Sequence, residues 1–526
     1  MIVYKNKGGE IIKKIKNISK KDLIEYFIIL VATLLLCQNF LQMHFSSDTY
    51  VLYDLGYMAY PQKYFLLDGR LISTVVCFIA GILHIPINAY IIGMDFIGII
   101  FVGTAIFTIS KVFEKLINPK SPILKISIVL ASFILILNQF TLEYLLFPES
   151  AVMCFGLFLN VLAVKIMIDN PRHKYIKIFI LLFLAGISYQ GLLNIFPLLA
   201  MITYLVKEIT EDKPYKEKEK AFFVEMIKLA VIVILVLLIC MGIVKIGTTL
   251  LNSKQDRRMH LISFEAILLR GKTVGGYLNE LWNECMAMLP KHTNTIVLIL
   301  SFVLLIISKT KKEYIMQYLL IVFITLSICI VPMFIFNTGV CGRVNVPLMM
   351  LWGSSIIILL AQASISPKGK ITNIIYAFTI ISCIINSIFI MQNITEHIAA
   401  NRVDENTGKT ISYLLNKYES ETGKTITKFS FKYDKNPQQY AVGIRPMQSL
   451  TERKFACSWC IRQAVNYYCN KNLKQVGMPA RIVEKFKNID YEEFSEEQII
   501  FDDDTLYMLI YWYIKFLKSY YSKCKK

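Results

Sequence analysis

Three carboxylates and an arginine lie shortly after the first apolar block of the chain, at Asp48, at Asp54 and in the run Asp68-Gly69-Arg70. A carboxylate that is partly desolvated beside a bilayer can act as a general base toward a sugar hydroxyl, and an arginine can hold a phosphate through two hydrogen bonds. The same residues also allow a structural interpretation, in which Asp48 caps the following helix and Asp68 pairs with Arg70. Residue type and spacing alone leave both interpretations open.

Further polar side chains are expected on the same side of the membrane, in loops between later apolar blocks. They are Glu143, Glu149, Tyr189, Gln190, Asn337 and Arg343. Polar groups near hydrocarbon are costly unless they face protein or water, so we expect these groups to line one cavity. Arg343 suits a phosphate and a lipid headgroup equally well. Asp95 lies near the end of an apolar block and is interpreted as an interfacial residue.

The composition indicates what kind of protein must position these residues. Of the 526 residues, 55% are apolar and 18% are charged, against roughly 45–50% and about 25% in soluble domains. The apolar residues arrive in blocks too long for one water-soluble core, which excludes a soluble enzyme. The formal net charge of +19 comes mostly from short loops between these blocks. That pattern sets membrane topology and does not indicate nucleic-acid binding.

Eleven apolar blocks predict a polytopic bundle of transmembrane helices, because each is long enough to cross most or all of a hydrocarbon layer of ~30 Å. They cover residues 26–43, 88–110, 123–141, 150–168, 176–188, 191–206, 222–248, 294–308, 315–335, 346–364 and 371–392. The shorter block 71–84 predicts a helix that lies at the interface or enters partway. The N-terminus and alternate loops are rich in Lys and Arg, so we expect them in the cytoplasm. The odd number of spans then places the C-terminus outside.

The fold class is therefore mainly α, with a transmembrane domain over residues 1–392 and a small extracytoplasmic α+β domain over residues 393–526. Residues 405–418 have a helical pattern, and residues 426–433 alternate with the period of a strand. The apolar stretch 506–517 is interrupted by Lys515, which favours a strand or a docking segment over a further span.

The cysteines do not predict a disulfide framework or a metal site. Six of the twelve lie inside apolar blocks, where a free thiol behaves as a small hydrophobe: Cys37, Cys77, Cys154, Cys240, Cys329 and Cys383. Cys457 and Cys460 have C-x-x-C spacing, but no second such pair or nearby histidine pair completes a zinc site. We therefore expect no metal site, although carboxylates of the first loop would bind a divalent ion if they converged.

The order of these features resembles a known family. A basic N-terminus and one span precede an outside loop with an early aspartate, followed by a Gly-Arg pair, many spans and a small tail. The segments that carry the resemblance are Ser47-Asp48-Thr49-Tyr50, Leu67-Asp68-Gly69-Arg70-Leu71, Ser188-Tyr189-Gln190 and Gly342-Arg343-Val344. In this order they resemble the membrane-embedded glycosyltransferases that use lipid-phosphate sugars, and the GtrII-type glucosyl transferases in particular.

The resemblance implies a GT-C-type fold that moves glucose or a related hexose from a polyprenyl-phosphate carrier to a surface polysaccharide outside the cytoplasm. It implies Asp48 as the catalytic base, because only Asp48 matches the family's position in the first outside loop. The expected substrate-binding residues are Arg70 and Arg343 for the carrier phosphate, with Asp68, Glu143, Tyr189 and Gln190 completing the site. Relatives often carry two adjacent acids where this chain has one, which argues against a metal-assisted variant. No nucleotide-binding motif is present, and no cofactor is expected.

A transporter or flippase for lipid-linked glycans is the competing hypothesis. It would need cationic groups on the outer side but no proton acceptor. Transporters often show internal repeats and charged residues near the bilayer midplane, and the sequence has neither. A structural partner in polymer-length control is a third hypothesis, which would require the tail to do the work. The expected partners are the bilayer, the lipid-linked donor and the acceptor polysaccharide, without nucleic acid.

Overall fold

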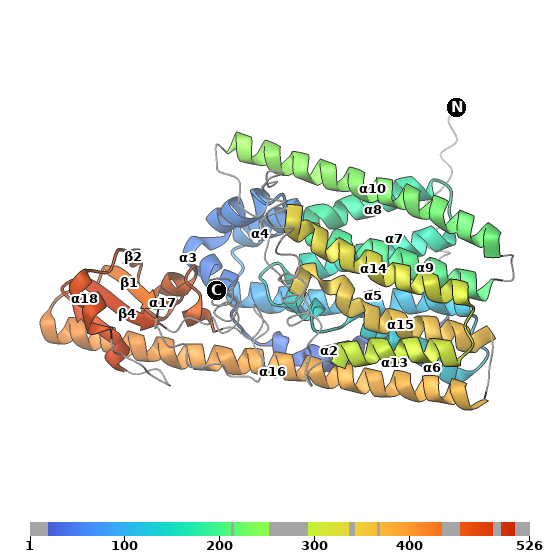
Figure 1. Cartoon of the computed structure of the whole chain (residues 1–526). Helices are drawn as coiled ribbons and strands as arrows, with labels where there is room; N and C mark the ends of the chain where they lie inside the picture. Colours follow the sequence, from blue (N-terminus) through green and yellow to red (C-terminus); the bar gives the residue numbers. More distant parts are fainter. Residues whose placement is uncertain are drawn as a thin grey trace, which may run out of the picture.

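The computed structural model of the chain describes residues 19–211, 215–251, 293–335, 342–365, 369–433, 453–487 and 496–510. Most of these residues are helical. Long helices lie side by side in one bundle, and a small domain that contains a β-sheet lies at one end of it (Figure 1).

The bundle is built from helices that coincide with the predicted spans. They are α2 (Lys20–Cys37), α5 (Ile87–Ile117), α6 (Pro122–Ile136), α7 (Ser150–Asp169), α8 (Lys174–Ser188), α9 (Ile195–Thr210), α10 (Tyr215–Leu250), α13 (Thr293–Ile307), α14 (Lys312–Ile335), α15 (Val346–Ile365) and α16 (Gly369–Thr422). Within the described ranges, eight helices are long and apolar enough to cross a membrane. Others, such as α6 and α13, are apolar but shorter, so the predicted number of spans stays a prediction.

Helices at the centre of the bundle are more buried than helices on its outside, as expected for a bundle whose outer surface faces lipid. In α15, 89% of the most apolar window is buried, against 22% in the span that contains α2. The outer face of α2 exposes large apolar side chains such as Leu23, Ile24 and Phe27. Large exposed apolar surfaces are uncommon on water-soluble monomers, so the surface of the bundle is compatible with a bilayer.

Short elements connect the bundle helices at the end that faces the sheet domain. They are η1 (Gln38–Leu41), α3 (Ser47–Pro61), the π-helical turn η2 (Gln62–Leu66), α4 (Leu71–Ile82), η3 (Thr141–Leu145), η4 (Gln190–Asn194) and η7 (Gly342–Val344). The predicted interfacial segment corresponds to α4. These elements carry most of the candidate site.

The N-terminus of α3 corrects one structural interpretation of the first loop. Ser46 is the cap residue: its hydroxyl accepts a hydrogen bond from the Thr49 amide, and Thr49 Oγ1 accepts one from the Ser46 amide. This reciprocal pair is a capping box. Asp48 lies in the first helical turn and does not cap the helix, so capping does not account for it.

The C-terminal domain contains a four-stranded sheet with the order β2-β1-β4-β3. Its strands are β1 (Lys428–Tyr433), β2 (Lys474–Gln475), β3 (Ile499–Asp502) and β4 (Thr505–Ile510), and its short helices are η8 (Lys454–Ala456), α17 (Ile461–Cys469), α18 (Ala480–Lys485) and η9 (Glu496–Gln498). β1 is parallel to β2 and β4, whereas β3 is antiparallel to β4. The predicted strand at 426–433 is confirmed, and β4 confirms a strand at the start of the stretch 506–517. The remainder of that stretch, including Lys515, lies outside the described residues.

Apolar side chains hold the sheet between helices. One cluster joins α16 and α17 to the sheet through residues such as Ile411, Val465 and Phe429, and a smaller one joins α18 to β4 through Ile482 and Leu509. Every residue of β4 is buried, as expected for a strand inside a sheet that is covered on both faces.

Helix α16 runs without interruption from the bundle into the sheet domain (Figure 1). The predicted helix at 405–418 is therefore confirmed as the distal part of a longer one. The predicted domain boundary between residues 392 and 393 falls inside this helix. In the bundle, the Asn386 amide donates a hydrogen bond to the Leu137 carbonyl at 2.8 Å, which fixes the position of α16 along its neighbours.

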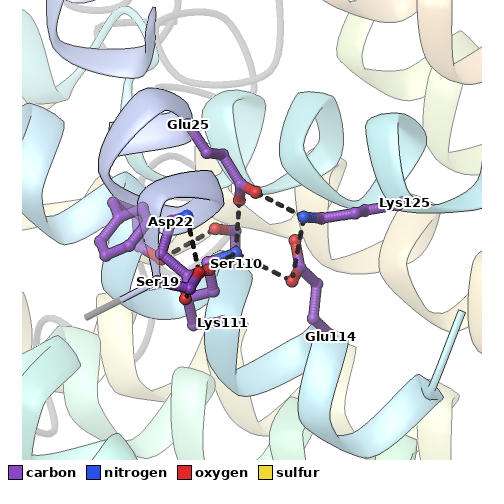
Figure 2. A network of polar contacts seen from close by, with 8 residues as sticks. Ser19, Asp22, Glu25, Ser110, Lys111, Glu114 and Lys125 are labelled. Atoms are coloured by element: carbon purple, nitrogen blue, oxygen red, sulfur yellow. Dashed lines mark hydrogen bonds and ion pairs between the residues drawn. The ribbon is translucent and has the colours of Figure 1, made fainter. Parts of the chain in front are cut away.

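A charged network marks the other end of the bundle (Figure 2). Lys111 Nζ lies 2.9 Å from Asp22 Oδ1, 2.8 Å from Glu25 Oε1 and 3.0 Å from Glu114 Oε2, and Lys125 Nζ lies 2.6 Å from Glu25 Oε2. These residues come from the start of α2, the end of α5 and the start of α6. The network therefore joins three helix ends on the side opposite the sheet domain.

Candidate active site

The candidate residues come from separate loops that meet at the sheet-domain end of the bundle. Arg70 precedes α4, Glu143 lies in η3 and Glu149 precedes α7, while Tyr189 follows α8 and Arg343 lies in η7. Because consecutive bundle helices alternate in direction, these loops share one end although they are far apart in sequence. The prediction that these five residues lie on one side is consistent with this arrangement.

Arg70 is the most highly connected cation of the site. Its Nη1 donates to Glu149 Oε1 at 2.8 Å, and its Nη2 lies 3.3 Å from Asp68 Oδ2. Its guanidinium carbon lies 4.9 Å from the centre of the Tyr189 ring, within the range of a cation–π contact. Burial acts to lower the pKa of Arg70, but the charges of Asp68 and Glu149 outweigh it and raise the pKa. The guanidinium therefore stays charged, and the predicted Asp68–Arg70 pair is present.

Glu149 is fully buried and electrostatically unusual. Burial raises its pKa to about 7; the Arg70 charge opposes this shift and the Asp48 charge adds to it. Its Oε2 has no hydrogen-bond partner among the residues that the structure describes. A carboxyl that titrates near neutrality beside a second carboxylate is typical of groups that handle protons or bind ligands.

The second arginine, Arg343, shares a tyrosine with Arg70. Arg343 Nε donates to the Tyr189 hydroxyl at 3.2 Å, and its guanidinium carbon lies 4.7 Å from the centre of the Phe147 ring. The Tyr144 hydroxyl donates to the Arg343 carbonyl at 2.8 Å. The side chains of both arginines are thus oriented by one aromatic residue, Tyr189.

Glu143 positions Arg343 through its main chain. Its Oε2 accepts a hydrogen bond from the Arg343 amide at 3.0 Å and lies 3.7 Å from Arg343 Nη1. A Cβ at Gly342 would lie 2.9 Å from Glu143 Oε1, so this close approach requires glycine. Burial raises the pKa of Glu143 although Arg343 lowers it. The structure therefore gives Glu143 a contact with Arg343, and its expected contact with the substrate stays a prediction.

Gly69 sets the backbone before Arg70. Its φ is +71°, and a Cβ there would lie 2.7 Å from Val244 Cγ2 and 3.1 Å from Gln190 Nε2. The Gln190 amide donates to the Asp68 carbonyl at 2.6 Å. Gln190 thereby fixes the turn that presents Arg70, a positioning role in addition to the predicted substrate contact.

Asp48 is half-buried in the first turn of α3. Its charge acts on Glu149 and on the buried Tyr60, raising the pKa of both. Asp48 therefore lies within electrostatic range of Glu149, the carboxyl that binds Arg70.

Asp54 and Asp95 have other roles. Asp54 accepts hydrogen bonds from Arg462 at 2.9 Å and Asn466 at 3.0 Å, so it joins α3 to the sheet domain. Asp95, interpreted from the sequence as interfacial, is instead 1% exposed, and its Oδ2 lies 2.9 Å from His44 Nε2. Its role is to hold the segment before α3, and it is not one of the site candidates. Asn337 lies outside the described residues.

No group of three or more metal-ligating side chains occurs in the described part of the chain. Cys457 and Cys460 are buried and form no disulfide with each other, and they pack with apolar residues such as Val152 and Leu52.

The sequence gives no specific role to two residues near the site. Glu149 is expected only as one of the polar residues that line the cavity, although its place directly before an apolar block on the outer side is a usable signal. Lys454, in the sheet domain, acts electrostatically on Glu143. Its sequence surroundings give no indication of a role, because the tail contains many lysines.

These features define a class: a polytopic helical protein, compatible with a membrane, that gathers two arginines and several carboxylates at one end of its bundle. The comparison with protein families is more specific. The sequence model of the family described as Glucosyl transferase GtrII matches residues 69–359. This is more than half of the chain, and the chain belongs to that family, which makes it a glycosyltransferase.

The family match confirms the resemblance and delimits it. Arg70, Glu143, Glu149, Tyr189, Gln190 and Arg343 lie inside the matched residues, whereas Asp48 and the sheet domain lie outside. A search among curated proteins gives no match to the chain.

Proposed function

We propose that the protein transfers glucose or a related hexose from a polyprenyl-phosphate carrier to a surface polysaccharide outside the cytoplasm. The family supports glycosyl transfer. The identity of the carrier, the identity of the acceptor and the side of the membrane on which transfer takes place are what we propose.

The convergence of Arg70 and Arg343 on Tyr189 carries the proposal. Arg70 lies over the Tyr189 ring and Arg343 donates to its hydroxyl, so two guanidinium groups contact one aromatic residue. Arg70 Nε is buried and has no hydrogen-bond partner among the described residues. A buried N–H group of a charged side chain that lacks a hydrogen-bond acceptor is costly. A phosphate oxygen of the lipid-linked sugar would accept this hydrogen bond.

The reaction is a direct displacement at the anomeric carbon. The acceptor oxygen forms the new glycosidic bond as the bond from that carbon to the phosphate oxygen breaks, and polyprenyl phosphate leaves with the bonding electron pair. Asp48 takes the acceptor proton. Arg70 and Arg343 stabilise the charge that develops on the phosphate, while Asp68, Gln190 and Glu143 hold the arginines in place.

The sidedness follows from the charge pattern. The Lys111–Lys125 network occupies the bundle end that the distribution of Lys and Arg assigns to the cytoplasm. The proposed catalytic site and the sheet domain would then be extracytoplasmic. A reporter fused after Lys526 tests this assignment, and activity of that reporter only in the cytoplasm would contradict it.

The purified protein in lipid nanodiscs provides the direct test of the reaction. We expect radiolabelled glucose to move from polyprenyl-phosphate-glucose to an added surface polysaccharide, and no transfer from a nucleotide sugar. Mass spectrometry of surface glycan from cells with and without the gene identifies the sugar. Transfer from the nucleotide sugar alone would overturn the choice of carrier.

A further inference from the structure

Buried polar atoms without a hydrogen-bond partner among the described residues gather around the Arg70–Glu149 pair. They are the Tyr60 hydroxyl, Arg70 Nε, Ser73 Oγ and Glu149 Oε2. Tyr60 and Glu149 are fully buried, and Ser73 is 1% exposed. A buried polar group without a partner is costly. Several such groups at a candidate active site therefore indicate a polar ligand.

Three of the four atoms are connected through the turn before α4. Arg70 Nη1 donates to Glu149 Oε1 at 2.8 Å, so Oε2 is the second oxygen of the carboxyl that Arg70 already binds. Ser73 lies in the first turn of α4, three residues after Arg70. The neighbouring Thr74 hydroxyl donates to the Arg70 carbonyl at 3.0 Å, whereas the Ser73 hydroxyl makes no such bond within the helix.

Tyr60 reaches the same region from α3. Its ring centre lies 5.0 Å from that of Phe65, and the Phe65 carbonyl accepts a hydrogen bond from the Arg70 amide at 2.8 Å. Tyr60 also belongs to the buried apolar cluster that contains Val152, three residues after Glu149. Tyr60 therefore lies in the core that joins the turn before α4 to the start of α7. The charges of Glu149 and Arg70 both act on it.

The chemistry of these groups differs from that of a pure anion site. The hydroxyls of Tyr60 and Ser73 can both donate and accept, and burial raises the pKa of Tyr60, which keeps the phenol neutral. Glu149 Oε2 accepts a hydrogen bond when the carboxyl is ionised and can donate one when it is neutral. A sugar hydroxyl also donates and accepts, so it pairs with Glu149 in either state. A phosphate oxygen without a proton only accepts, and it suits Arg70 Nε, which only donates.

We propose that the Tyr60 hydroxyl, the Ser73 hydroxyl and Glu149 Oε2 bind hydroxyl groups of the transferred hexose, next to the phosphate at Arg70. This inference rests on the proposed function and adds the position of the sugar to it. In a lipid-phosphate sugar the phosphate and the hexose share one oxygen, so their binding groups must be neighbours. A hexose that lacks one of these hydroxyls leaves a buried group unpaired, which makes the three residues determinants of sugar specificity.

The test compares two lipids in nanodiscs: polyprenyl phosphate and polyprenyl-phosphate-glucose. Only the second carries the sugar. We expect Tyr60→Phe and Ser73→Ala each to weaken binding of polyprenyl-phosphate-glucose by about 3–10-fold, the loss of one neutral hydrogen bond. Binding of polyprenyl phosphate should be unchanged in both variants. Equal weakening of both lipids would assign the two hydroxyls to the phosphate and overturn the hexose site.

Two variants at the other end of the bundle are matched controls. Ser127→Ala removes another buried hydroxyl that has no hydrogen-bond partner among the described residues, two positions after Lys125 of the charged network. Tyr314→Phe removes a buried hydroxyl that donates to the Glu208 carbonyl at 3.0 Å. Both controls should leave the affinity for either lipid unchanged. A selective loss of affinity for the glucose lipid in the controls as well would show that the effect is not local, and the inference would be wrong.

Glucose lipids that each lack one sugar hydroxyl test the same site without a change in the protein. Wild type should bind at least one of them about 3–10-fold more weakly than polyprenyl-phosphate-glucose. Tyr60→Phe or Ser73→Ala should not lose further affinity for the lipid that lacks its own partner hydroxyl. If wild type binds every one of these lipids as tightly as the parent, the inference is wrong, even where a variant does not fold.

Two outcomes separate this inference from the proposed function. If Tyr60→Phe and Ser73→Ala lower only the melting temperature and leave both affinities unchanged, the buried hydroxyls are structural and the inference fails while the proposed function stands. If wild type transfers no sugar from polyprenyl-phosphate-glucose, but the variants still weaken its binding selectively, the proposed function fails while the sugar site stands.

Discussion

Arg70 and Glu149 form a 2.8 Å hydrogen bond although 79 positions separate them in the sequence. The pair connects the turn before α4 to the start of α7, and Asp48 acts on it from α3. A cation, a carboxyl that titrates near neutrality and a candidate base thus come together from three helices.

Asp48→Asn should abolish sugar transfer. The amide keeps the size of the side chain but cannot take the proton from the hydroxyl of the acceptor sugar. Removal of a general base typically lowers the rate by ~10²–10⁴-fold. Turnover of lipid-linked donor by purified protein measures the effect. Donor binding and protein level should persist.

Two other carboxylates are controls for Asp48. Glu405→Gln removes only an exposed pair with Lys409 and should leave the rate unchanged. Asp54→Asn should have a much smaller effect on the rate than Asp48→Asn, but it should loosen the contact with Arg462, which proteolysis of the sheet domain would report. Near-normal turnover in Asp48→Asn would reject the proposed mechanism and favour a flippase.

Arg70→Lys should lower kcat/KM for the lipid-linked sugar, although the substitution keeps the positive charge. A planar guanidinium can contact Glu149, Asp68 and the Tyr189 ring together, whereas an ammonium group is a point charge. We expect kcat/KM to fall by about 10–100-fold, the cost of one charge-assisted hydrogen bond. Arg481→Lys, at an exposed pair with Asp502, is the matched control. Equal kinetics for wild type and Arg70→Lys across donor concentrations would exclude phosphate binding by Arg70.

Donor affinity should fall as the pH rises through about 7, the pKa of Glu149. Above this pH the ionised carboxylate competes with the donor phosphate for Arg70, and below it the neutral carboxyl does not. A polyprenyl-phosphate sugar is a phosphodiester and does not titrate in this range, so the effect belongs to the protein. Measurement of donor KM from pH 6 to 8 should show this rise in wild type, whereas Glu149→Gln should flatten it. A similar rise in both proteins would assign the titration to another group.

The raised pKa of Glu149 also makes the free energy of unfolding depend on pH. The pKa of Glu149 is raised in the folded protein above its usual value of 4.5, so the folded state binds this proton more tightly. The stabilisation is fully present below pH 4.5 and is lost as the pH rises through about 7. Thermal unfolding of wild type and Glu149→Gln over this window measures the contribution.

Gly69→Ala should displace the turn that presents Arg70. The substitution carries the cost of a positive φ, ~1–2 kcal/mol, and a clash with Val244 that adds overpacking of ~1–3 kcal/mol. Gly423→Ala separates these effects, because Gly423 has φ +67° and nothing within 4 Å of an added Cβ. We expect Gly69→Ala to lower both the melting temperature and activity, and Gly423→Ala to lower only the melting temperature. Equal losses of activity would show that steric fit at Gly69 does not matter.

Most helices could be predicted from the sequence because long apolar blocks have one stable solution in a bilayer. The continuity of α16 could not, since its distal part is polar and the loss of apolar residues looked like a domain boundary. A helix that leaves the bilayer no longer needs an apolar surface, so composition stops indicating its course at that point.

The site residues could be predicted from their residue types and from the side of the membrane on which they are expected, but their contact partners could not be predicted. The outer position of Arg70 and Glu149 follows from the span pattern, whereas their contact depends on how the turn before α4 meets the start of α7. Asp54 is as close to Asp48 in sequence as a site residue would be, yet it binds Arg462. The contact of Asp54 with Arg462 depends on the docking of a separate domain, which local sequence does not encode.

Because α16 is uninterrupted, the number of residues in it sets the rotation of the sheet domain about the helix axis relative to the bundle. Asn386 binds the bundle, His397 contacts His44, and Asp404 fastens the segment that carries Lys454. These residues return to nearly the same face of the helix, since Asn386 and Asp404 are separated by about five turns at 3.6 residues per turn. One residue inserted between them would rotate the sheet domain by about 100° about the helix axis. The stretch 387–403 should therefore tolerate substitutions at its exposed positions but very few changes in length.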